Sequence, residues 1–559
     1  MKFRTIWSVT ACATVVLARS DALPVEKAYG VNLGGWLLAE AWMFPKEWQR
    51  MGGEICDADC SSCAASEFAL VQKIGQAKAD QVFKAHWETW FTKADVDAIA
   101  DAGLNMVRIP LGWWIVPGLV DRSTEFFPRG GMKYLKRGLR MLKEKGIYAI
   151  LDLHALPGVS TPNQMFAGRC TSDVQFYTER NYNRALGWTA TMTAISHIDP
   201  DFSHVFAIEA INEPIMDATK TPGYGEYQKN FVKIVRLTEF ALGIICPDTD
   251  YSKIFPRPQV ANSSIDAGLL QVAQHTDPTL AAALKLTAGS IKELSPELEL
   301  SDTHLRRAIG LDLSSTQLRR DIFLESELHA AWAKEYKKGH GVGRGKIASD
   351  GRLMYGLEGE SLVASLGRRT DDLGLPLPFG PRMEAYSDHH PRGRVSASLH
   401  KGVNRKCLSA MFQNKGWQYN NPPNPADAAN GPQVYDAHLY FSFGGVADPN
   451  PDAYLRTICN TDRVKQATED RNRPLVFGEW SIATNFNATR EFLFDWADAQ
   501  KFIYAGQAEG WLFWSFKIEA GSPNIPYWSY FESLKAGYFT KDPAKLNNPD
   551  VCKPYIGKS

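Results

Sequence analysis

The sequence predicts an α/β protein built as a (β/α)8 TIM barrel with one long insertion between the fourth helix and the fifth strand. Short apolar segments recur along the 559 residues, and most are followed by a polar, aromatic-rich loop and then a helical pattern. Several segments are continuously hydrophobic rather than alternating, as expected of parallel strands covered on both faces. Eight such units fit one closed barrel.

The expected strands are eight short apolar segments spread over the whole chain. They are residues 30–33, 106–109, 149–153, 206–211, 407–412, 434–440, 475–478 and 511–516. Helical patterns lie between them, with examples at residues 132–145, 227–242 and 490–505.

The first 22 residues are expected to be a secretory signal peptide. Lys2 and Arg4 precede an apolar stretch at residues 6–17, which small residues around Ala18 and Ser20 follow. This is the order of a cleaved signal, and the stretch is too short to span a bilayer. A membrane anchor or a buried N-terminal helix is the alternative. We expect cleavage near Ser20 or Ala22 and a secreted protein, extracellular or in a cell wall.

The cysteine count fits secretion. Cys12 would leave with the signal, so eight remain: Cys56, Cys60, Cys63, Cys170, Cys246, Cys407, Cys459 and Cys552. An even number in an oxidising compartment favours disulfides, although their pairing cannot be read from spacing. Zinc binding by the first three is the alternative, but no fourth ligand sits at a usual distance. Two glycosylation sequons begin at Asn262 and Asn487.

The interval 247–406 is far longer than a usual barrel connection. Residues 277–308 look helical and amphipathic, whereas residues 310–406 have little periodicity. We expect an insertion that is partly helical and partly disordered. Residues 310–406 could instead be a cap over a pocket or a partner surface, or could reflect a gene-model error. The expected organisation is a signal at 1–22, barrel at 23–246, insertion at 247–406, and barrel with a tail at 407–559.

Charge and aromatic content narrow the function classes. The chain has 62 basic and 62 acidic residues, so it lacks the basic surplus of a nucleic-acid-binding protein. No apolar run is long enough for a membrane span. Sixteen Trp, 28 Phe and 20 Tyr suit aromatic-lined grooves. We expect no nucleic acid partner and a monomer.

Two glutamates follow apolar strands at positions that share one pocket. Asn212 and Glu213 end the fourth expected strand, and Glu479 ends the seventh. Because the carboxyl ends of barrel strands converge, residues remote in sequence meet there. Glycosidic cleavage needs two such groups, one protonated to release the leaving oxygen and one ionised to attack. The acid should have a raised pKa, from burial and from its ionised neighbour.

Other strand ends supply supporting groups. Arg108 lies on the second strand and could stabilise an ionised nucleophile, although a salt bridge at the barrel rim is the alternative. His154, His438 and Tyr440 follow the third and sixth strands and could orient carboxylates and sugar hydroxyls. Trp514 could provide a flat platform for a sugar ring, whereas neighbouring aromatic residues are expected in the core.

Taken together, these motifs resemble glycoside hydrolase family 5, especially the fungal exo-β-1,3-glucanases (glucan 1,3-β-glucosidases). The order is Asn32-Leu-Gly-Gly-Trp, Arg-Ile-Pro, Asp-Leu-His-x-x-Pro-Gly, Asn-Glu-Pro, His-x-Tyr, Phe-Gly-Glu-Trp and Trp-x-Phe-Trp-Ser-Phe-Lys. The resemblance covers residues 28–245 and 407–519. It implies a secreted retaining enzyme that needs no metal or cofactor.

The resemblance also implies roles for individual residues. Glu213 matches the acid/base and Glu479 the nucleophile, while Asn212 matches the residue that binds the sugar 2-hydroxyl. The other matches are Glu40, which binds the terminal glucose in exo-acting members, the sugar-stacking Trp514, and the supporting residues Arg108, His154, His438 and Tyr440. The loop after His154 departs from the family pattern, which leaves the linkage open.

The leading hypothesis is a secreted hydrolase that releases glucose from the non-reducing ends of β-1,3-glucan. Alternatives within the same fold are a β-1,6- or β-1,4-glucan hydrolase and a transglycosylase. A carbohydrate-binding wall protein without catalysis is the alternative from another class.

Overall fold

The computed structural model describes residues 22–56, 59–254, 269–274, 276–301, 346–347, 353–354 and 406–558. The chain forms two compact units, Met1–Asp312 with Val403–Ser559, and Leu313–Gly402. In the second unit the described residues are two short antiparallel strands, β5 (Lys346–Ile347) and β6 (Leu353–Met354). The predicted signal peptide, except Ala22, and most of residues 302–405 lie outside the described residues.

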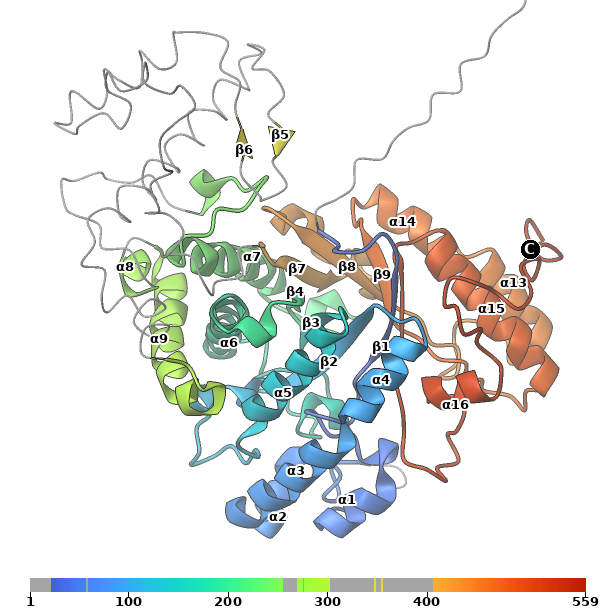
Figure 1. The fold of residues 1–559 in the computed structure, drawn as a ribbon, viewed down its shortest axis with the longest axis horizontal. Coiled ribbons are helices and arrows are strands. Elements are labelled where there is room, and N and C mark those ends of the chain that lie inside the picture. Colours follow the sequence, from blue (N-terminus) through green and yellow to red (C-terminus); the bar gives the residue numbers. More distant parts are fainter. Residues whose placement is uncertain are drawn as a thin grey trace, which may run out of the picture. The chain divides into compact units, whose positions relative to one another are not determined.

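The first unit contains a closed barrel of eight parallel strands, which confirms the predicted (β/α)8 fold (Figure 1). Around the barrel the order is β1-β10-β9-β8-β7-β4-β3-β2. The strands are β1 (Ala28–Asn32), β2 (Met106–Gly112), β3 (Tyr148–Ala155), β4 (Val205–Glu209), β7 (Ser409–Gln413), β8 (Gln433–His438), β9 (Leu475–Glu479) and β10 (Gly510–Phe513). All eight predicted segments overlap these strands, with ends shifted by a few residues.

Helices surround the strands (Figure 1). Those before β4 are α1 (Pro45–Met51), α2 (Glu67–Ile74), α3 (Gln76–Trp90), α4 (Lys93–Asp101), α5 (Gly131–Glu144) and α6 (Glu179–Ile198). Those after it are α7 (Tyr224–Ala241), α8 (Leu269–Gln274), α9 (Pro278–Leu298), α13 (Pro451–Cys459), α14 (Arg463–Glu469), α15 (Arg490–Gly506) and α16 (Tyr530–Lys535). Short 3-10 helices lie at residues 41–43, 113–115, 117–119, 165–167, 200–202, 218–220 and 251–253.

The regular alternation is interrupted between β7 and β8. The connection, all of which is described, contains only the 3-10 helices η9 (Lys415–Trp417) and η10 (Pro425–Ala428). Prolines at 422, 423, 425 and 432 remove backbone donors and restrict the residues before them, so an α-helix cannot run through this segment. The result is an irregular connection that begins at the carboxyl end of β7 and returns to the amino end of β8.

The amino ends of the strands are closed by an apolar cluster. It joins the first residues of several strands to the segment that precedes β1, and its members include Leu23, Met106, Phe206, Met411 and Leu512. Ser409 also donates a hydrogen bond to the carbonyl of Ala22 at 2.6 Å. A ligand can therefore enter the barrel axis only from the carboxyl end.

Polar residues inside the barrel lie in register across neighbouring strands. Asn32 pairs with Arg108, and Asp152 pairs with Glu209. Nearer the mouth, His438 pairs with Glu479. Because every residue of β2, β4, β8 and β9 is buried, these polar groups must satisfy one another.

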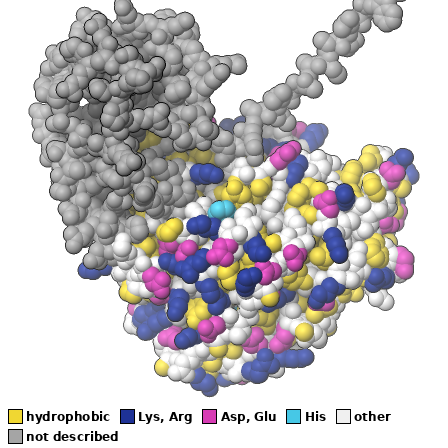
Figure 2. Space-filling view, in the orientation of Figure 1, with side chains coloured by type: hydrophobic (Ala, Val, Ile, Leu, Met, Phe, Trp, Pro, Cys, Tyr) yellow, Lys and Arg dark blue, Asp and Glu magenta, His cyan; other side chains and the backbone are white. Residues whose placement is uncertain are grey.

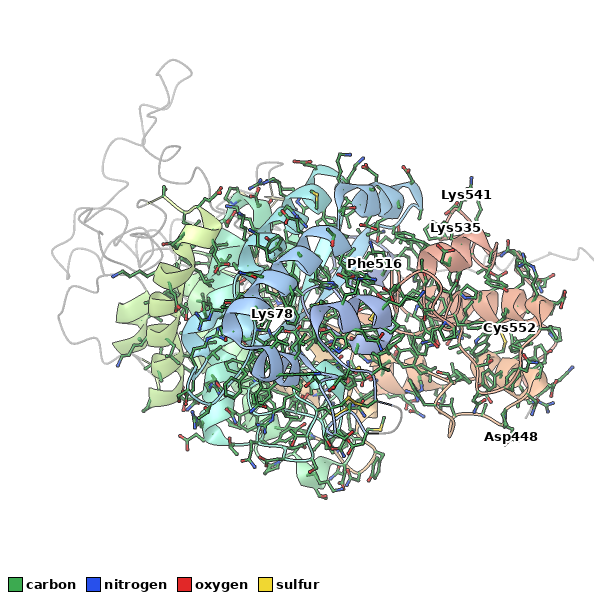
Figure 3. The ribbon with its side chains drawn as sticks, turned by 90° about the horizontal axis from the view of Figure 1, so that it is seen from below. Lys78, Asp448, Phe516, Lys535, Lys541 and Cys552 are labelled. Atoms are coloured by element: carbon green, nitrogen blue, oxygen red, sulfur yellow. A yellow bond between two sulfur atoms is a disulfide. The ribbon has the colours of Figure 1, made fainter. Side chains whose placement is uncertain are left out.

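Four disulfides use all eight cysteines of the described chain, so the zinc alternative is wrong. They join Cys56 to Cys63, Cys60 to Cys170, Cys246 to Cys407, and Cys459 to Cys552. Cys552 lies among the C-terminal elements (Figure 3). The third bridge joins residues 161 positions apart, at the two ends of the predicted insertion.

Part of the predicted insertion belongs to the first unit. Helix α9 lies within the stretch predicted to be helical and packs against α6. Thr287 of α9 donates a hydrogen bond to the carbonyl of Gly187 of α6 at 3.4 Å. The predicted helical stretch is too long, because α9 ends at Leu298 and Glu299 adopts a left-handed conformation. Residues 302–308 lie outside the described residues, and the insertion boundaries remain predictions.

The surface carries both signs of charge. On the face seen in Figure 2, basic and acidic side chains of the described residues are interspersed, in keeping with the zero net charge. Asn487 of one sequon is exposed, and Asn262 of the other lies outside the described residues. Among the described helices, none combines the length and hydrophobicity needed to cross a membrane.

Candidate active site

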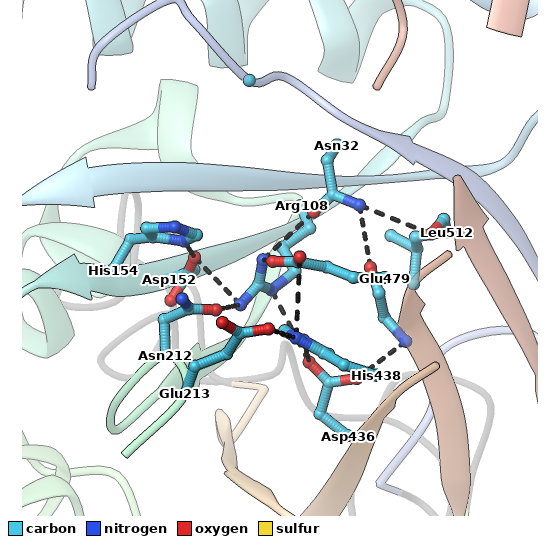
Figure 4. Close-up of polar contacts among 12 residues, drawn as sticks. Asn32, Arg108, Asp152, His154, Asn212, Glu213, Asp436, His438, Glu479 and Leu512 are labelled. Atoms are coloured by element: carbon cyan, nitrogen blue, oxygen red, sulfur yellow. Dashed lines mark hydrogen bonds and ion pairs between the residues drawn. The ribbon is translucent and has the colours of Figure 1, made fainter. Parts of the chain in front are cut away.

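The predicted site residues lie on or after the carboxyl ends of the barrel strands, and Figure 4 shows six of them together: Arg108, His154, Asn212, Glu213, His438 and Glu479. Arg108, His154, His438 and Glu479 lie on strands β2, β3, β8 and β9. The others follow strand ends: Glu40, Asn212, Glu213, Tyr440 and Trp514. Each of these residues contacts another member of the set or one of its direct neighbours, as described below.

The two glutamates face each other across His438. Its Nδ1 lies 2.8 Å from Glu213 Oε1 and 3.6 Å from Glu479 Oε2. One carboxylate oxygen from each glutamate and one His438 ring nitrogen all lie within 4.8 Å of one another. The Glu213 side chain is 18% exposed and that of Glu479 only 6%. The carboxylate separation, which sequence could not give, is therefore short.

Glu479 is surrounded by hydrogen-bond donors. Arg108 Nη1 donates to Oε1 at 2.7 Å, and the Tyr440 hydroxyl donates to Oε2 at 2.9 Å. Burial raises the pKa of Glu479 above its usual value, while His438 and Arg108 act in the opposite direction. The donors stabilise the carboxylate form of a group that burial alone would protonate.

Arg108 is fully buried and contacts several polar side chains of the site. Its guanidinium contacts Glu209 at 2.7 Å and Asp152 at 3.0 Å, in addition to Glu479. It also donates to the side-chain oxygens of Asn32 at 3.1 Å and Asn212 at 2.9 Å. The alternative of a salt bridge at the barrel rim is therefore wrong, because the guanidinium lies inside the barrel.

The buried acids beneath the glutamates were missed at the sequence level. Burial raises the pKa of Glu209 well above its usual value, Arg108 acts to lower it, and Asp436 and Asp152 act to raise it. Burial also acts to raise the pKa of Asp436, but His438 and Arg108 together lower it. Asp436 accepts a hydrogen bond from Gly478 at 2.7 Å, and an added Cβ at Gly478 would come within 2.1 Å of that carboxylate.

One sequence signal could have identified two of these acids. Asp152 and Asp436 each precede a candidate histidine by two residues, and strand residues two apart point to the same face. Each aspartate contacts its histidine, at 2.6 Å for His154 and 3.0 Å for His438. Glu209 had no comparable signal.

The acids around His438 favour its charged form. Although its burial acts to lower the pKa, Glu479 and Asp436 raise it well above the usual value. Two groups of potential metal ligands in the described residues include His438. In the structure His438 makes ion pairs with Glu213, Asp436 and Glu479, which are acids of these two groups.

The backbone at Glu213 has an unusual conformation held by its neighbours. Its φ of 42° lies in the left-handed region, which disfavours a residue with a side chain. The Thr161 hydroxyl donates to the carbonyl of Glu213 at 2.7 Å, and Trp417 Nε1 donates to that of Pro214 at 2.6 Å. Ile215 N donates to the Tyr177 hydroxyl at 3.0 Å. These bonds hold the Glu213 side chain toward the pocket.

A second group of residues lies beside Glu479. The rings of His154 and Trp514 are stacked with centroids 5.6 Å apart. Trp42 Nε1 donates to Glu40 at 2.9 Å, and burial raises the pKa of Glu40 to about 7. A neutral Glu40 carboxyl can donate a hydrogen bond as well as accept one, which suits recognition of a sugar hydroxyl.

Comparisons with known proteins agree with this geometry. Residues 72–282 match the family described as Cellulase (glycosyl hydrolase family 5). Glucan endo-1,6-beta-glucosidase B from Emericella nidulans is 37% identical over 220 residues, which are 39% of this chain and 52% of that protein. Probable glucan 1,3-beta-glucosidase A from Aspergillus fumigatus is 29% identical over 230 residues, 39% of this chain and 49% of that protein.

The sequence matches cover only part of the chain, whereas a structural alignment covers most of it. Among solved structures, a rutinosidase from Aspergillus niger aligns over 92% of this chain and 98% of that chain, with 17% identity and a TM-score of 0.49. This chain spans about half the length of the curated relatives it matches. The family match nevertheless covers Arg108 on β2, His154 on β3 and Glu213 after β4. This chain is therefore similar to glycosyl hydrolase family 5 over residues 72–282.

Proposed function

We propose that the protein is a retaining glycoside hydrolase acting on β-glucan, with Glu213 as acid/base and Glu479 as nucleophile. The observation that carries the proposal is the pair of carboxylates with oxygens within 4.8 Å of each other. Retaining enzymes hold their carboxyl groups about 5–5.5 Å apart, whereas inverting enzymes leave about 6.5–9.5 Å for a water molecule. The short gap supports double displacement.

The surroundings of the two glutamates support this division of roles. Glu479 is held as a carboxylate by Arg108 and Tyr440, so its oxygens can attack the anomeric carbon. Glu213 is the more exposed of the two and carries no such donor pair. It protonates the departing oxygen as the glycosyl–Glu479 ester forms, and then removes a proton from the incoming water.

We propose β-1,6-linked glucan as the first substrate to test. The relatives that share 34–37% identity with this chain are named glucan endo-1,6-beta-glucosidase or probable forms of it. The leading hypothesis from the sequence, release of glucose from β-1,3-glucan, is kept as the alternative substrate. The position of Glu40 beside Trp42 and near Glu479 supports that alternative, because it matches the glutamate that binds terminal glucose in exo-acting members.

Product analysis separates these substrates. Pustulan, laminarin and cello-oligosaccharides present β-1,6, β-1,3 and β-1,4 linkages respectively. Oligosaccharides from pustulan would indicate endo-1,6 action, whereas glucose alone from laminarin would indicate exo-1,3 action. Transfer products at high sugar concentration would identify a transglycosylase. Glucan binding without any released product would indicate a non-catalytic wall protein.

Azide rescue tests the two roles separately. Glu479→Gly should lose turnover, and azide should restore it with formation of an α-glycosyl azide from an activated β-glucoside. Glu213→Ala with azide should give the β-glycosyl azide, because azide then intercepts the glycosyl-enzyme. The same anomer from both variants would contradict the assignment. Secretion to the cell wall, a monomeric state and independence from metal remain predictions of the same proposal.

A further inference from the structure

We propose that Trp417, Tyr419 and Met216 form a binding platform for glucan residues on the leaving-group side of the cleaved bond. We call these three residues the leaving-side platform. The proposal rests on the function proposed above, and it assigns a role to the irregular β7–β8 connection.

The platform is built by a ladder of hydrogen bonds between two loops that are about 200 residues apart in sequence. The segment 417–420 after β7 lies along the segment 214–218 after β4. The bonds are Trp417 Nε1 to Pro214 O at 2.6 Å, Gln418 Nε2 to Ile215 O at 2.7 Å, Tyr419 N to Met216 O at 3.3 Å, Asn420 Nδ2 to Asp217 Oδ1 at 2.6 Å, and Ala218 N to Asn420 Oδ1 at 2.8 Å. Each residue of one segment is thereby fixed to the other.

Large apolar side chains are exposed on this fixed base. Tyr419 is 74% exposed and Met216 is 50% exposed. Of the six exposed large hydrophobic residues in the described chain, these two and Phe443 follow strands at the carboxyl end of the barrel. Exposed aromatic groups on a rigid scaffold lose little conformational entropy when a ligand covers them. The fixed, exposed side chains are therefore better suited to binding a ligand than the side chains of a mobile loop would be.

The position of the platform identifies which part of the substrate it meets. Met216 is only three residues from Glu213, so the two residues are at most about 11 Å apart along the chain. The Trp417 ring lies edge-on to His438, with centroids 5.7 Å apart. Because Glu213 protonates the leaving oxygen, the departing sugar lies on its side of the pocket. Glu40 and Trp514 belong to the other group, beside His154.

The chemistry of the platform suits a sugar chain. A pyranose ring in β-linkage has apolar C–H faces and a polar rim, so it can cover the Tyr419 ring and the Met216 side chain. Asn420 and Asp217 adjoin them with polar groups, and hydrogen bonds from Thr219 and Asn420 lower the pKa of Asp217, which stays ionised. The ligand class is a neutral β-glucan chain with at least one residue beyond the cleaved bond.

Substrates that differ on the leaving side test the platform. We would measure kcat/KM for a β-glycosyl fluoride, which has no leaving sugar, and for glucan oligosaccharides of increasing length. In Tyr419→Ala we expect kcat/KM to fall roughly three- to tenfold for the longer oligosaccharides, with a smaller loss for the fluoride. Tyr419→Phe keeps the ring and should restore the length dependence. Ile556→Ala, which removes another exposed side chain, is the matched control.

Two results would overturn the platform. One is an equal loss for the fluoride and for every oligosaccharide, and the other is no loss at all. Binding of the same oligosaccharides to Glu479→Gln, with and without Tyr419→Ala, gives a readout without turnover, and equal affinities would also count against the platform. If the wild-type protein cleaves neither glucans nor the fluoride, the proposed function is wrong, which is a distinguishable outcome.

Discussion

The hydroxyl of Thr161 lies 2.7 Å from the backbone carbonyl oxygen of Glu213, to which it donates a hydrogen bond. Thr161 belongs to the loop after β3, and Glu213 follows β4 with a φ of 42°. A loop that differs from the family pattern thus contacts the residue proposed to protonate the leaving group.

Thr161→Val should weaken acid catalysis, because it removes the hydroxyl while preserving the shape of the side chain. We expect kcat/KM to fall about fivefold for alkyl glucosides, corresponding to roughly 1 kcal/mol for one hydrogen bond. Dinitrophenyl glucosides need little protonation and should be affected less. Thr161→Ser should behave as wild type. Equal losses for both classes of glucoside would mean that the hydroxyl serves only the fold.

Tyr440→Phe should move the acidic limb of the pH–rate profile upward. The nucleophile must be ionised, so activity is lost as pH falls through the pKa of Glu479, which burial has already raised. Removing the 2.9 Å hydrogen bond from Tyr440 destabilises the carboxylate and raises that pKa further. Tyr435→Phe on the preceding strand β8, where the hydroxyl accepts from Gln433, is the control. An unshifted limb would show that Tyr440 does not stabilise the ionised form.

Glu67→Gln should become more stable relative to the wild type as the pH rises. Glu67 accepts a hydrogen bond from Ala39 N at 2.7 Å, next to Glu40, and burial raises its pKa from 4.5 to about 8. The folded state binds the proton of Glu67 more tightly than the unfolded state does. The free energy of unfolding of the wild-type protein therefore falls as the pH rises from about 4.5 to about 8. The difference in free energy of unfolding between the variant and the wild type should change by about 3 kcal/mol in favour of the variant from pH 5 to pH 8.

Denaturant unfolding of both proteins at the two pH values measures this shift. Glu125→Gln replaces a carboxylate that is partly exposed and serves as the control. A pH-independent difference between Glu67→Gln and wild type would contradict a protonated Glu67.

Replacing both Cys246 and Cys407 by Ser should lower the free energy of unfolding by about 2–5 kcal/mol, as is usual for a bridge that closes a long loop. The sequence separation is 161 residues. Denaturant unfolding under non-reducing conditions measures the loss. Unchanged stability would mean that other contacts already fix these two chain ends, such as the 2.7 Å hydrogen bond from Leu408 N to Glu239.

Much of the barrel could be predicted because each strand is a local apolar run followed by polar residues. Glu213 and Glu479 were found in the same way, since each directly follows such a run. Their convergence at the carboxyl end required only the general rule for parallel barrels. Local pattern and fold geometry were sufficient for these features.

Other features depend on partners distant in sequence. Glu209 is a site residue only because Arg108, 101 positions away, contacts it inside the barrel. The ladder of hydrogen bonds that supports Tyr419 joins loops about 200 residues apart, and no periodic pattern in the sequence predicts it. The same applies to the pairing of the cysteines. Such contacts are fixed by tertiary packing, which a single sequence does not encode in any local pattern.

The bridge between Cys246 and Cys407 has a consequence for the integrity of the enzyme. Glu213 precedes residue 246 and Glu479 follows residue 407, so the two halves of the catalytic pair lie on opposite sides of it. Of the four disulfides in the described chain, the other three lie within one side or the other. A protease that cut between these cysteines would leave a two-chain molecule still covalently joined, which only a reducing agent could separate.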